Sequence, residues 1–181
     1  MKPGDVFVVN APYNGGTHLP DVTVITPIFD DAGDDILFFV ASRGHHADIG
    51  GITPGSMPPD SKVVEEEGIL FDNFMLVDGG EFLEDKLRKH LADHPYPARN
   101  PDHNIADLKA QIAAGAKGVQ EVHKMIDQFG LDVVHAYMRH VQDNAEEQVR
   151  RVIDIMQDGE FTYPTDEGSK IKVKISFNKE K

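Results

Sequence analysis

The chain has 181 residues, of which 40% are hydrophobic and 27% are charged, a composition that suits one globular domain. Acidic residues outnumber basic ones by 31 to 18, which gives a net charge of −13. Nucleic acids and anionic membranes attract basic surfaces, so this charge argues against both as partners. The absence of cysteine excludes disulfides and thiolate metal sites. The sequence has neither a membrane-spanning apolar run nor a signal-peptide core, so we expect a cytoplasmic protein.

The first hundred residues have the composition of a β-rich region. Runs of β-branched and apolar residues predict strands at 5–10, 22–29, 36–42 and 74–77. The polar turn between the second and third strands predicts a hairpin. Pro27 indicates that the second strand lies at a sheet edge or ends early, and the nearly continuous apolar run ILFFVA predicts a third strand buried on both faces. A short charged helix is expected at 82–92, followed by a proline-rich linker at 95–101.

From residue 101 the pattern is helical. Asn104 is a good N-cap residue, and Gly130 is a natural C-cap. Between them apolar residues and one glycine recur at spacings of three and four: Ile105, Leu108, Ile112, Gly115, Val119, Val122, Ile126 and Phe129. A second long helix follows almost at once and ends near residue 158, so the two are predicted to form an antiparallel hairpin. The apolar stripe of this hairpin is longer than so small a sheet needs to cover it, so we predict that the chain oligomerises through it.

The fold class predicted from these elements is α+β, with a mostly antiparallel sheet and a long antiparallel helical hairpin. Residues 1–100 form the β-rich portion, and residues 101–159 form the helical hairpin. Residues 160–181 contain an edge strand, predicted at 171–177, in which lysines alternate with apolar residues. The last residues, SFNKEK, are predicted to be a solvated tail.

Two short stretches, THLPD at 17–21 and RGHHADIGG at 43–51, contain residues that can bind metal. His18 and Asp21 are three residues apart in a predicted loop, and the predicted hairpin returns the chain to His45. An imidazole–carboxylate–imidazole set suits zinc, manganese, iron or nickel and leaves coordination positions open. From spacing alone, surface hydrogen bonding or a capped turn is the more frequent reason for such residues.

His46 and Asp48 need a separate interpretation. In an extended segment neighbouring side chains point to opposite faces, so His45 and His46 would not bind one metal without a kink. Asp48 is two residues after His46, so the two side chains would lie on the same face of an extended segment. Asp48 could there orient His46 or accept a proton. We therefore predict proton-transfer roles for His46 and Asp48. The alternative is that Asp48 caps the turn that follows.

Four stretches together resemble the hydantoinase B/oxoprolinase family. They are GDVFVVNAPYNGGTHLPDVTVITPIF at 4–29, ASRGHHADIGGITPGSMPPDS at 41–61, EEEGI at 65–69 and PARNPDHNIADLKAQIAA at 97–114. The resemblance extends over residues 3–160. It implies a subunit or fragment of an ATP-dependent cyclic amidohydrolase that opens hydantoin or 5-oxoproline rings. The family's His-x-x-Asp pair and later histidine match His18, Asp21 and His45, which implies a divalent manganese, zinc or iron ion there.

The resemblance also implies partners. ATP would be bound by a hydantoinase A-type subunit rather than by this chain, and we expect a homo- or hetero-oligomer that acts on a cyclic amide. The family includes large subunits of acetone carboxylase-like enzymes, so one alternative is an ATP-dependent ketone carboxylase-type subunit. The family usually has aspartate where this chain has Ala11, and full members are much longer. A non-catalytic, truncated binding module is therefore the other alternative.

Overall fold

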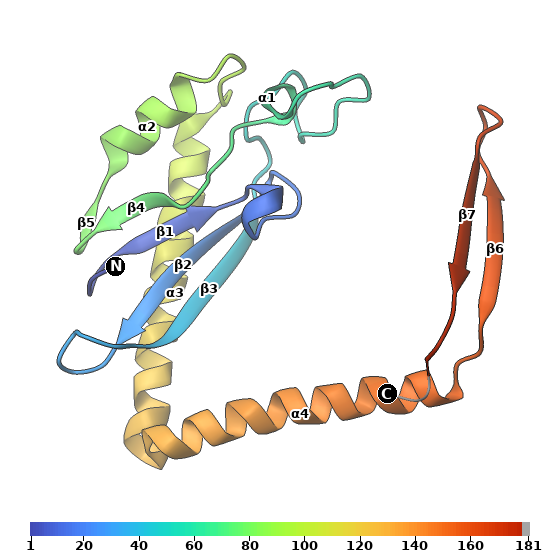
Figure 1. The fold of residues 1–181 in the computed structure, drawn as a ribbon. Coiled ribbons are helices and arrows are strands. Elements are labelled where there is room, and N and C mark those ends of the chain that lie inside the picture. The colour runs from blue at the N-terminus through green and yellow to red at the C-terminus, as the bar shows by residue number, and fades with distance from the viewer. Residues whose placement is uncertain (179–181) are drawn as a thin grey trace. The chain divides into compact units, whose positions relative to one another are not determined.

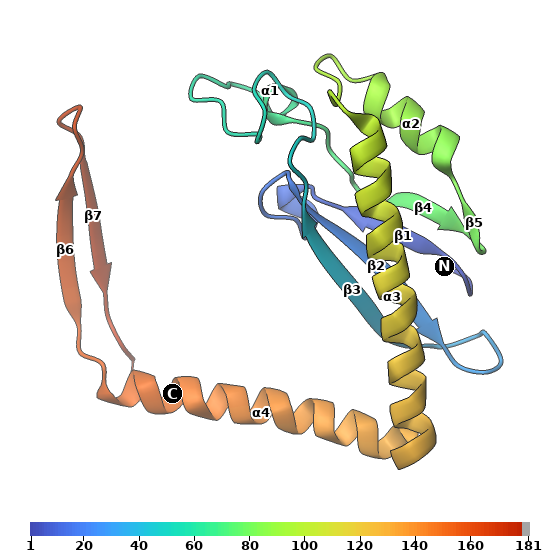
Figure 2. The ribbon, with the colours of Figure 1, turned by 180° about the vertical axis from the view of Figure 1, so that it is seen from behind.

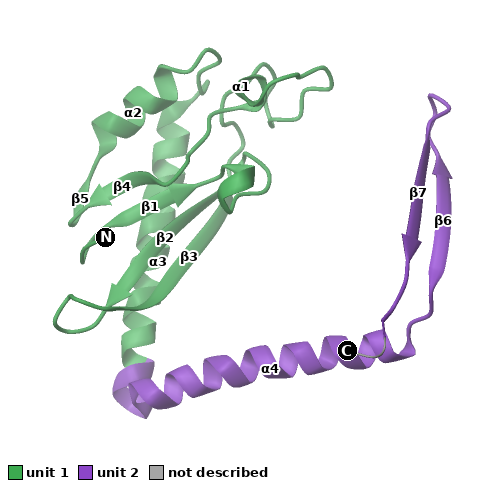
Figure 3. Ribbon diagram, in the orientation of Figure 1, with its two compact units in different colours: residues 1–124 green, residues 125–181 purple. Residues whose placement is uncertain are grey.

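The computed structural model describes residues 1–178, and the chain divides into two compact units, residues 1–124 and 125–181 (Figure 3). The first unit contains a five-stranded sheet in the order β3-β2-β1-β4-β5, in which every pair of neighbours is antiparallel (Figure 1). The strands are β1 (Val6–Val9), β2 (Asp21–Phe29), β3 (Ile36–His45), β4 (Phe74–Asp78) and β5 (Glu81–Phe82). The predicted α+β class with a mostly antiparallel sheet is confirmed.

The predicted hairpin between the second and third strands is present. β2 and β3 pair along their whole length, from Asp21 opposite His45 at one end to Phe29 opposite Ile36 at the other. The turn between them is held by Asp30, whose Oδ1 accepts hydrogen bonds from two backbone N–H groups of the turn. This register places the first residue of β2 beside the last residue of β3.

Two predictions about these strands are wrong. β3 lies at the edge of the sheet rather than inside it, and Ile36 and Phe39 are 39% and 57% exposed. β2 is an interior strand and continues to Phe29, although Pro27 suggested an edge strand or an early end. The proline is tolerated because β1 pairs with β2 only as far as Ile25, so the backbone at Pro27 has a neighbouring strand on one side only.

Helix α3 (Pro101–Phe129) crosses one face of the sheet (Figure 2). Its buried residues include Ile105, Leu108 and Gly115, which belong to the predicted apolar stripe. Glycines allow the close approach: a Cβ at Gly115 would lie 3.0 Å from Thr26 Oγ1, and at Gly118 one would lie 2.7 Å from the nearest Val40 methyl.

The start of α3 corrects another prediction. The helix begins at Pro101, a position that suits proline because the first N–H groups of a helix need no partner within it. Asn100 is the capping residue, since its Oδ1 and backbone oxygen both accept from the His103 N–H. Asn104, predicted as the N-cap, instead lies inside the helix and is buried.

The core lies between the sheet, α3 and the shorter elements of the first unit. These are η1 (Pro12–Asn14), α1 (Val64–Glu67) and α2 (Glu84–Ala92). The helix expected at 82–92 corresponds to α2, which buries Leu87 and Leu91 in this core. Fully or almost fully buried members of the core also include Val8, Val22, Val24, Ile49, Phe71, Leu76 and Leu108.

The second unit contains helix α4 (Leu131–Ile155) and an antiparallel ribbon of β6 (Gly159–Pro164) and β7 (Lys170–Ile175). The second long helix and the strand near residues 171–177 were predicted, whereas β6 was not. Antiparallel pairing of the two long helices stays a prediction. The end of the predicted tail, residues 179–181, lies outside the described residues. No helix within residues 1–178 has both the length and the apolarity that crossing a membrane requires.

Candidate metal centre

His18, Asp21 and His45 lie together on the first unit. One potential ligand atom from each residue lies within 4.8 Å of those from the other two. His45 Nδ1 is 2.8 Å from Asp21 Oδ1, and the rings of His18 and His45 have centroids 5.8 Å apart. The β2–β3 register explains the first contact, because Asp21 and His45 are directly paired across the two strands. His18 precedes β2 in the connection from β1.

Asn10 holds the segment that carries His18. Its side chain is completely buried; Nδ2 donates to the carbonyls of Leu19 and Ile69, and Oδ1 accepts from the Phe71 N–H. Nearby, Gly16 leaves no room for a side chain, because a Cβ there would lie 2.0 Å from Asn10 O. These contacts fix the path of the chain into β2. The sequence pattern did not single out Asn10, because its partners are distant in the sequence.

The donor set fits a divalent transition metal. His18 Nε2 is buried and has no hydrogen-bond partner among the described residues, and an unsatisfied buried polar atom costs about 1–3 kcal/mol. The hydrogen bond from His45 is the main cause of a lowered Asp21 pKa, and nearby positive charge adds to the effect. The side chains of His45 and Asp21 are 61% and 31% exposed. An ion bound here would be reachable from solvent or by a substrate.

His46 lies on the other side of the backbone from His45 and is almost completely buried. Its Nδ1 is 3.0 Å from Asn104 Nδ2, and its Nε2 is 3.2 Å from Gln111 Oε1. Gln111 Nε2 donates to the carbonyls of Val22 and Ser42, which leaves Oε1 as the acceptor. His46 Nε2 is therefore the protonated nitrogen and Nδ1 accepts from Asn104. Both ring nitrogens of His46 are thus hydrogen-bonded to side chains of α3.

Asp48 is tied to Arg99. Its Oδ2 accepts from the Arg99 backbone N–H at 2.8 Å, and its Oδ1 accepts from the guanidinium at 2.6 Å. The same guanidinium donates to the Gly51 carbonyl. The side chain of Asp48 is 18% exposed, so part of it still meets solvent. Asp48 thus joins the segment after β3 to the segment before α3.

Sequence reasoning missed Gln111 and Arg99, which shape this region, and it assigned Asn104 to a helix cap instead. Asn104 and Gln111 are seven residues apart, and two turns of helix place them on the same side of α3 as the apolar stripe. Polar residues on the buried side of a helix indicate a specific buried partner. That signal was present in the sequence, but it does not identify the partner as His46.

Comparisons with known proteins establish the family of the chain. The family model described as hydantoinase B/oxoprolinase matches residues 1–181. The chain belongs to the hydantoinase B/oxoprolinase family. It is 49% identical to a 5-oxoprolinase of Dictyostelium discoideum over 99% of this chain and 14% of that protein. It is 42% identical to a 5-oxoprolinase of Saccharomyces cerevisiae over 100% of this chain and 15% of that protein.

Two solved structures show the same architecture. An ATP-dependent caprolactamase from Pseudomonas jessenii superposes with a TM-score of 0.75 at 26% identity, over 97% of this chain and 31% of that chain. An acetone carboxylase in a nucleotide-free state superposes with a TM-score of 0.65 over 88% of this chain and 20% of that chain. At 20% identity the acetone carboxylase likeness shows the fold alone. This hydantoinase B/oxoprolinase family member spans about a seventh of the length of its 5-oxoprolinase relatives.

Proposed function

We propose that this chain supplies the metal centre of an ATP-dependent enzyme that opens cyclic amides of the hydantoin or 5-oxoproline type. The observation that carries the proposal is the convergence of His18, Asp21 and His45, whose ligand atoms lie within 4.8 Å of one another. Relatives named 5-oxoprolinase and a neighbour named ATP-dependent caprolactamase support the cyclic-amide substrate class.

In this proposal His18, Asp21 and His45 hold a manganese, zinc or iron ion. A bound ion of this kind supplies Lewis acidity toward a carbonyl oxygen or lowers the pKa of a water molecule. Asp21 is prepared for this role because its lowered pKa keeps the carboxylate ionised in mildly acidic solution. The orphaned Nε2 of His18 and the exposed ring of His45 complete the donor set.

For His46 we propose a positioning role in place of the predicted proton transfer. Its bonds to Asn104 and Gln111 anchor the end of β3 to α3, and His45 is the preceding residue. Asp48 could accept a proton only by giving up contacts with Arg99, so we propose that it too holds the segment in place.

ATP use is assigned to a partner of the hydantoinase A type, in a complex with this chain. One relative, from Pseudomonas sp. strain NS671, is named as the B-type subunit of a D-/L-hydantoinase, and is 34% identical over 88% of this chain and 26% of that protein. The name of this relative supports a complex in which a second subunit is present. The glycine pairs at 15–16 and 50–51 do not match a P-loop, so they offer no phosphate cradle of that kind.

The first test is elemental analysis of the purified chain after exposure to manganese, zinc and iron. We expect about one ion per chain, and its loss in both His18→Ala and His45→Ala. The matched control is His140→Ala, an exposed histidine on α4 that should leave the metal content unchanged. Circular dichroism would verify that all variants are folded.

Metal that is absent from the wild-type chain, or that survives both ligand substitutions, would contradict the metal centre. The reaction class needs a second assay, with a hydantoinase A-type partner, ATP and 5-oxoproline. ATP turnover that depends on 5-oxoproline and is lost in His45→Ala supports the amidohydrolase. A chain that binds metal but supports no turnover on any cyclic amide would fit the binding-module alternative instead.

A further inference from the structure

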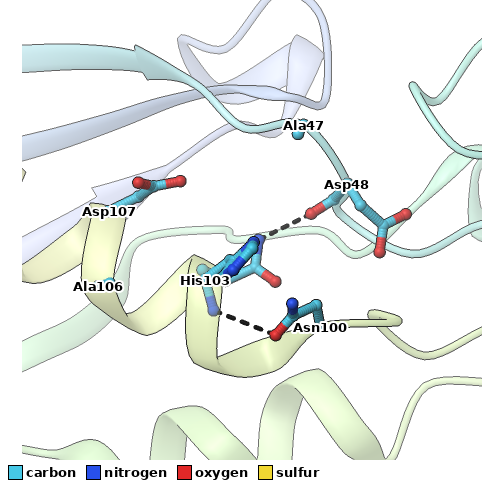
Figure 4. Close-up of a pocket in the computed structure, with 7 residues that line it drawn as sticks. Ala47, Asp48, Asn100, His103, Ala106 and Asp107 are labelled. Carbon is cyan, nitrogen blue, oxygen red and sulfur yellow. Dashed lines mark hydrogen bonds between the residues drawn. The ribbon is translucent and has the colours of Figure 1, made fainter.

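A pocket of about 310 Å³ lies between the first two turns of α3 and the segment that follows β3 (Figure 4). His103 and Asp107 project from the helix, and Asp48 comes from the segment above it (Figure 4). Asn100 and Asn104 also line the pocket. None of these five residues belongs to the cluster of His18, Asp21 and His45.

Asn104 is the most informative residue of this pocket. It is only 3% exposed, and its Nδ2 donates to His46 Nδ1 and to the Asp48 carbonyl at 2.7 Å. These two bonds fix which side of the amide is nitrogen. Its Oδ1 is buried and has no hydrogen-bond partner among the described residues. Because an amide oxygen can only accept, a ligand that satisfies it must bring a hydrogen-bond donor.

The charged groups of the pocket favour a cation. Asp48 is compensated by the guanidinium of Arg99 at 2.6 Å. Asp107 lies one helical turn beyond His103, on the same side of α3. Within residues 1–178, neither the His103 nor the Asp107 side chain has a hydrogen-bond or ion-pair partner. One uncompensated carboxylate and one imidazole therefore line the same pocket as Asn104, whose buried amide oxygen is unsatisfied.

A helix start would ordinarily favour an anion through its free N–H groups. Here Pro101 has no N–H, and the N–H of His103 is used by Asn100. The uncompensated carboxylate of Asp107 would also repel an anion. The local charge therefore opposes the usual preference of a helix N-terminus.

We propose that this pocket binds a small molecule through a primary ammonium group. Such a group carries one positive charge and three N–H donors, which match the Asn104 amide oxygen, the Asp107 carboxylate and the His103 imidazole. Opening a lactam such as 5-oxoproline at its C–N bond, by addition of water, leaves a carboxylate and a primary amine of this class on the product, whereas a hydantoin ring opens to a carbamoyl compound without such an amine. That connection rests on the proposed function, whereas ammonium binding itself can be tested without any reaction.

The test is a titration of the 15N-labelled 181-residue chain with ethylammonium chloride, followed by NMR. We expect saturable shifts of the Asn104 side-chain amide and of the backbone amides of His103 and Asp107. Tetramethylammonium at equal ionic strength has the same charge but no N–H donor, so it should not reproduce them. Asp107→Asn should weaken binding about tenfold, and the matched control Asp127→Asn, also exposed on α3, should bind as the wild type does.

Equal shifts with tetramethylammonium or sodium would show an effect of charge alone and would overturn the proposal. The proposal would also be overturned if ethylammonium caused no shifts while inorganic phosphate did. The same holds if ethylammonium caused none while manganese broadened the resonances of His103 and Asp107. These readouts are independent of the metal analysis of His18 and His45. Failure of one proposal can therefore be distinguished from failure of the other.

Discussion

Asp5 is a carboxylate whose role is structural. The residue is 2% exposed, and its two oxygens accept from the backbone N–H groups of Lys2 at 2.8 Å and Gly79 at 3.0 Å. It therefore joins the N-terminal turn to the turn between β4 and β5. These hydrogen bonds, that of Lys2 first, lower the pKa of Asp5 below its ordinary value. A carboxylate with a lowered pKa makes stability depend on pH in a defined direction.

We expect Asp5→Asn to lower the melting temperature at neutral pH. The folded pKa lies below the unfolded value of roughly 3.9, so the stabilisation by Asp5 is complete above that value. The stabilisation by Asp5 is lost as the pH falls through the folded pKa, because the carboxylate of the folded wild-type chain then becomes protonated. Thermal unfolding followed by circular dichroism should show a gap between wild type and Asp5→Asn that narrows in acid. Asp31→Asn, in an exposed turn, is the control and should show no such gap. A gap that stays constant with pH would contradict this account.

At the scale of elements, the contact between α3 and the end of β3 connects the core with the metal-binding cluster. Gln111 bonds to Val22, Ser42 and His46, and so joins α3 to both strands of the hairpin. Gly44 leaves the space that this amide occupies, since a Cβ there would lie 3.1 Å from Gln111 Cδ. The position of His45 thus depends on a side chain of α3 that does not touch it.

We predict that Gly44→Ala destabilises the chain by about 1–3 kcal/mol, because the added methyl displaces the Gln111 amide from its hydrogen bonds. It should also weaken metal binding, since the adjacent His45 would shift. Denaturant unfolding measures the first effect and metal titration the second. The control is Gly159→Ala, where a Cβ meets nothing within 4 Å, and its stability should change by less than ~0.5 kcal/mol. Wild-type stability in Gly44→Ala would mean that Gln111 can move without loss.

At the scale of the whole molecule, the second unit presents apolar faces. In the β6–β7 ribbon Phe161 pairs with Val173 and Tyr163 pairs with Ile171, so one face is apolar while lysines occupy the other. These four side chains are 48–69% exposed. On α4, Val141 is 67% exposed. A two-stranded ribbon is at best marginally stable by itself, so such faces are expected to be covered.

We predict that the purified chain self-associates through these faces. Size-exclusion chromatography with light scattering should give a mass above that of the monomer at micromolar concentration. Phe161→Thr combined with Val141→Glu should shift the mass toward the monomer, because both substitutions remove exposed apolar surface. Thr162→Ser, on the polar face of the ribbon, is the control. A wild-type chain that is monomeric under these conditions would refute the prediction.

The sequence by itself determined the type and approximate place of most elements, because hydrophobic periodicity, turn residues and capping residues act locally. The sequence also identified His18, Asp21 and His45 as candidate metal ligands, because their spacing and the family resemblance can be recognised from the sequence alone. Helix α3 and the β2–β3 hairpin followed from the same local patterns.

Only the tertiary structure decided which surfaces are buried. An apolar run such as that of β3 has the same sequence pattern at the edge of a sheet as at its centre. Its place in the sheet depends on strand order, which is set by contacts between distant segments. For the same reason His46 looked like a reactive neighbour of His45, until α3 brought Asn104 and Gln111 to its two nitrogens. The pattern of residues along the chain determines local conformation, whereas the partner of a buried polar group depends on packing between elements.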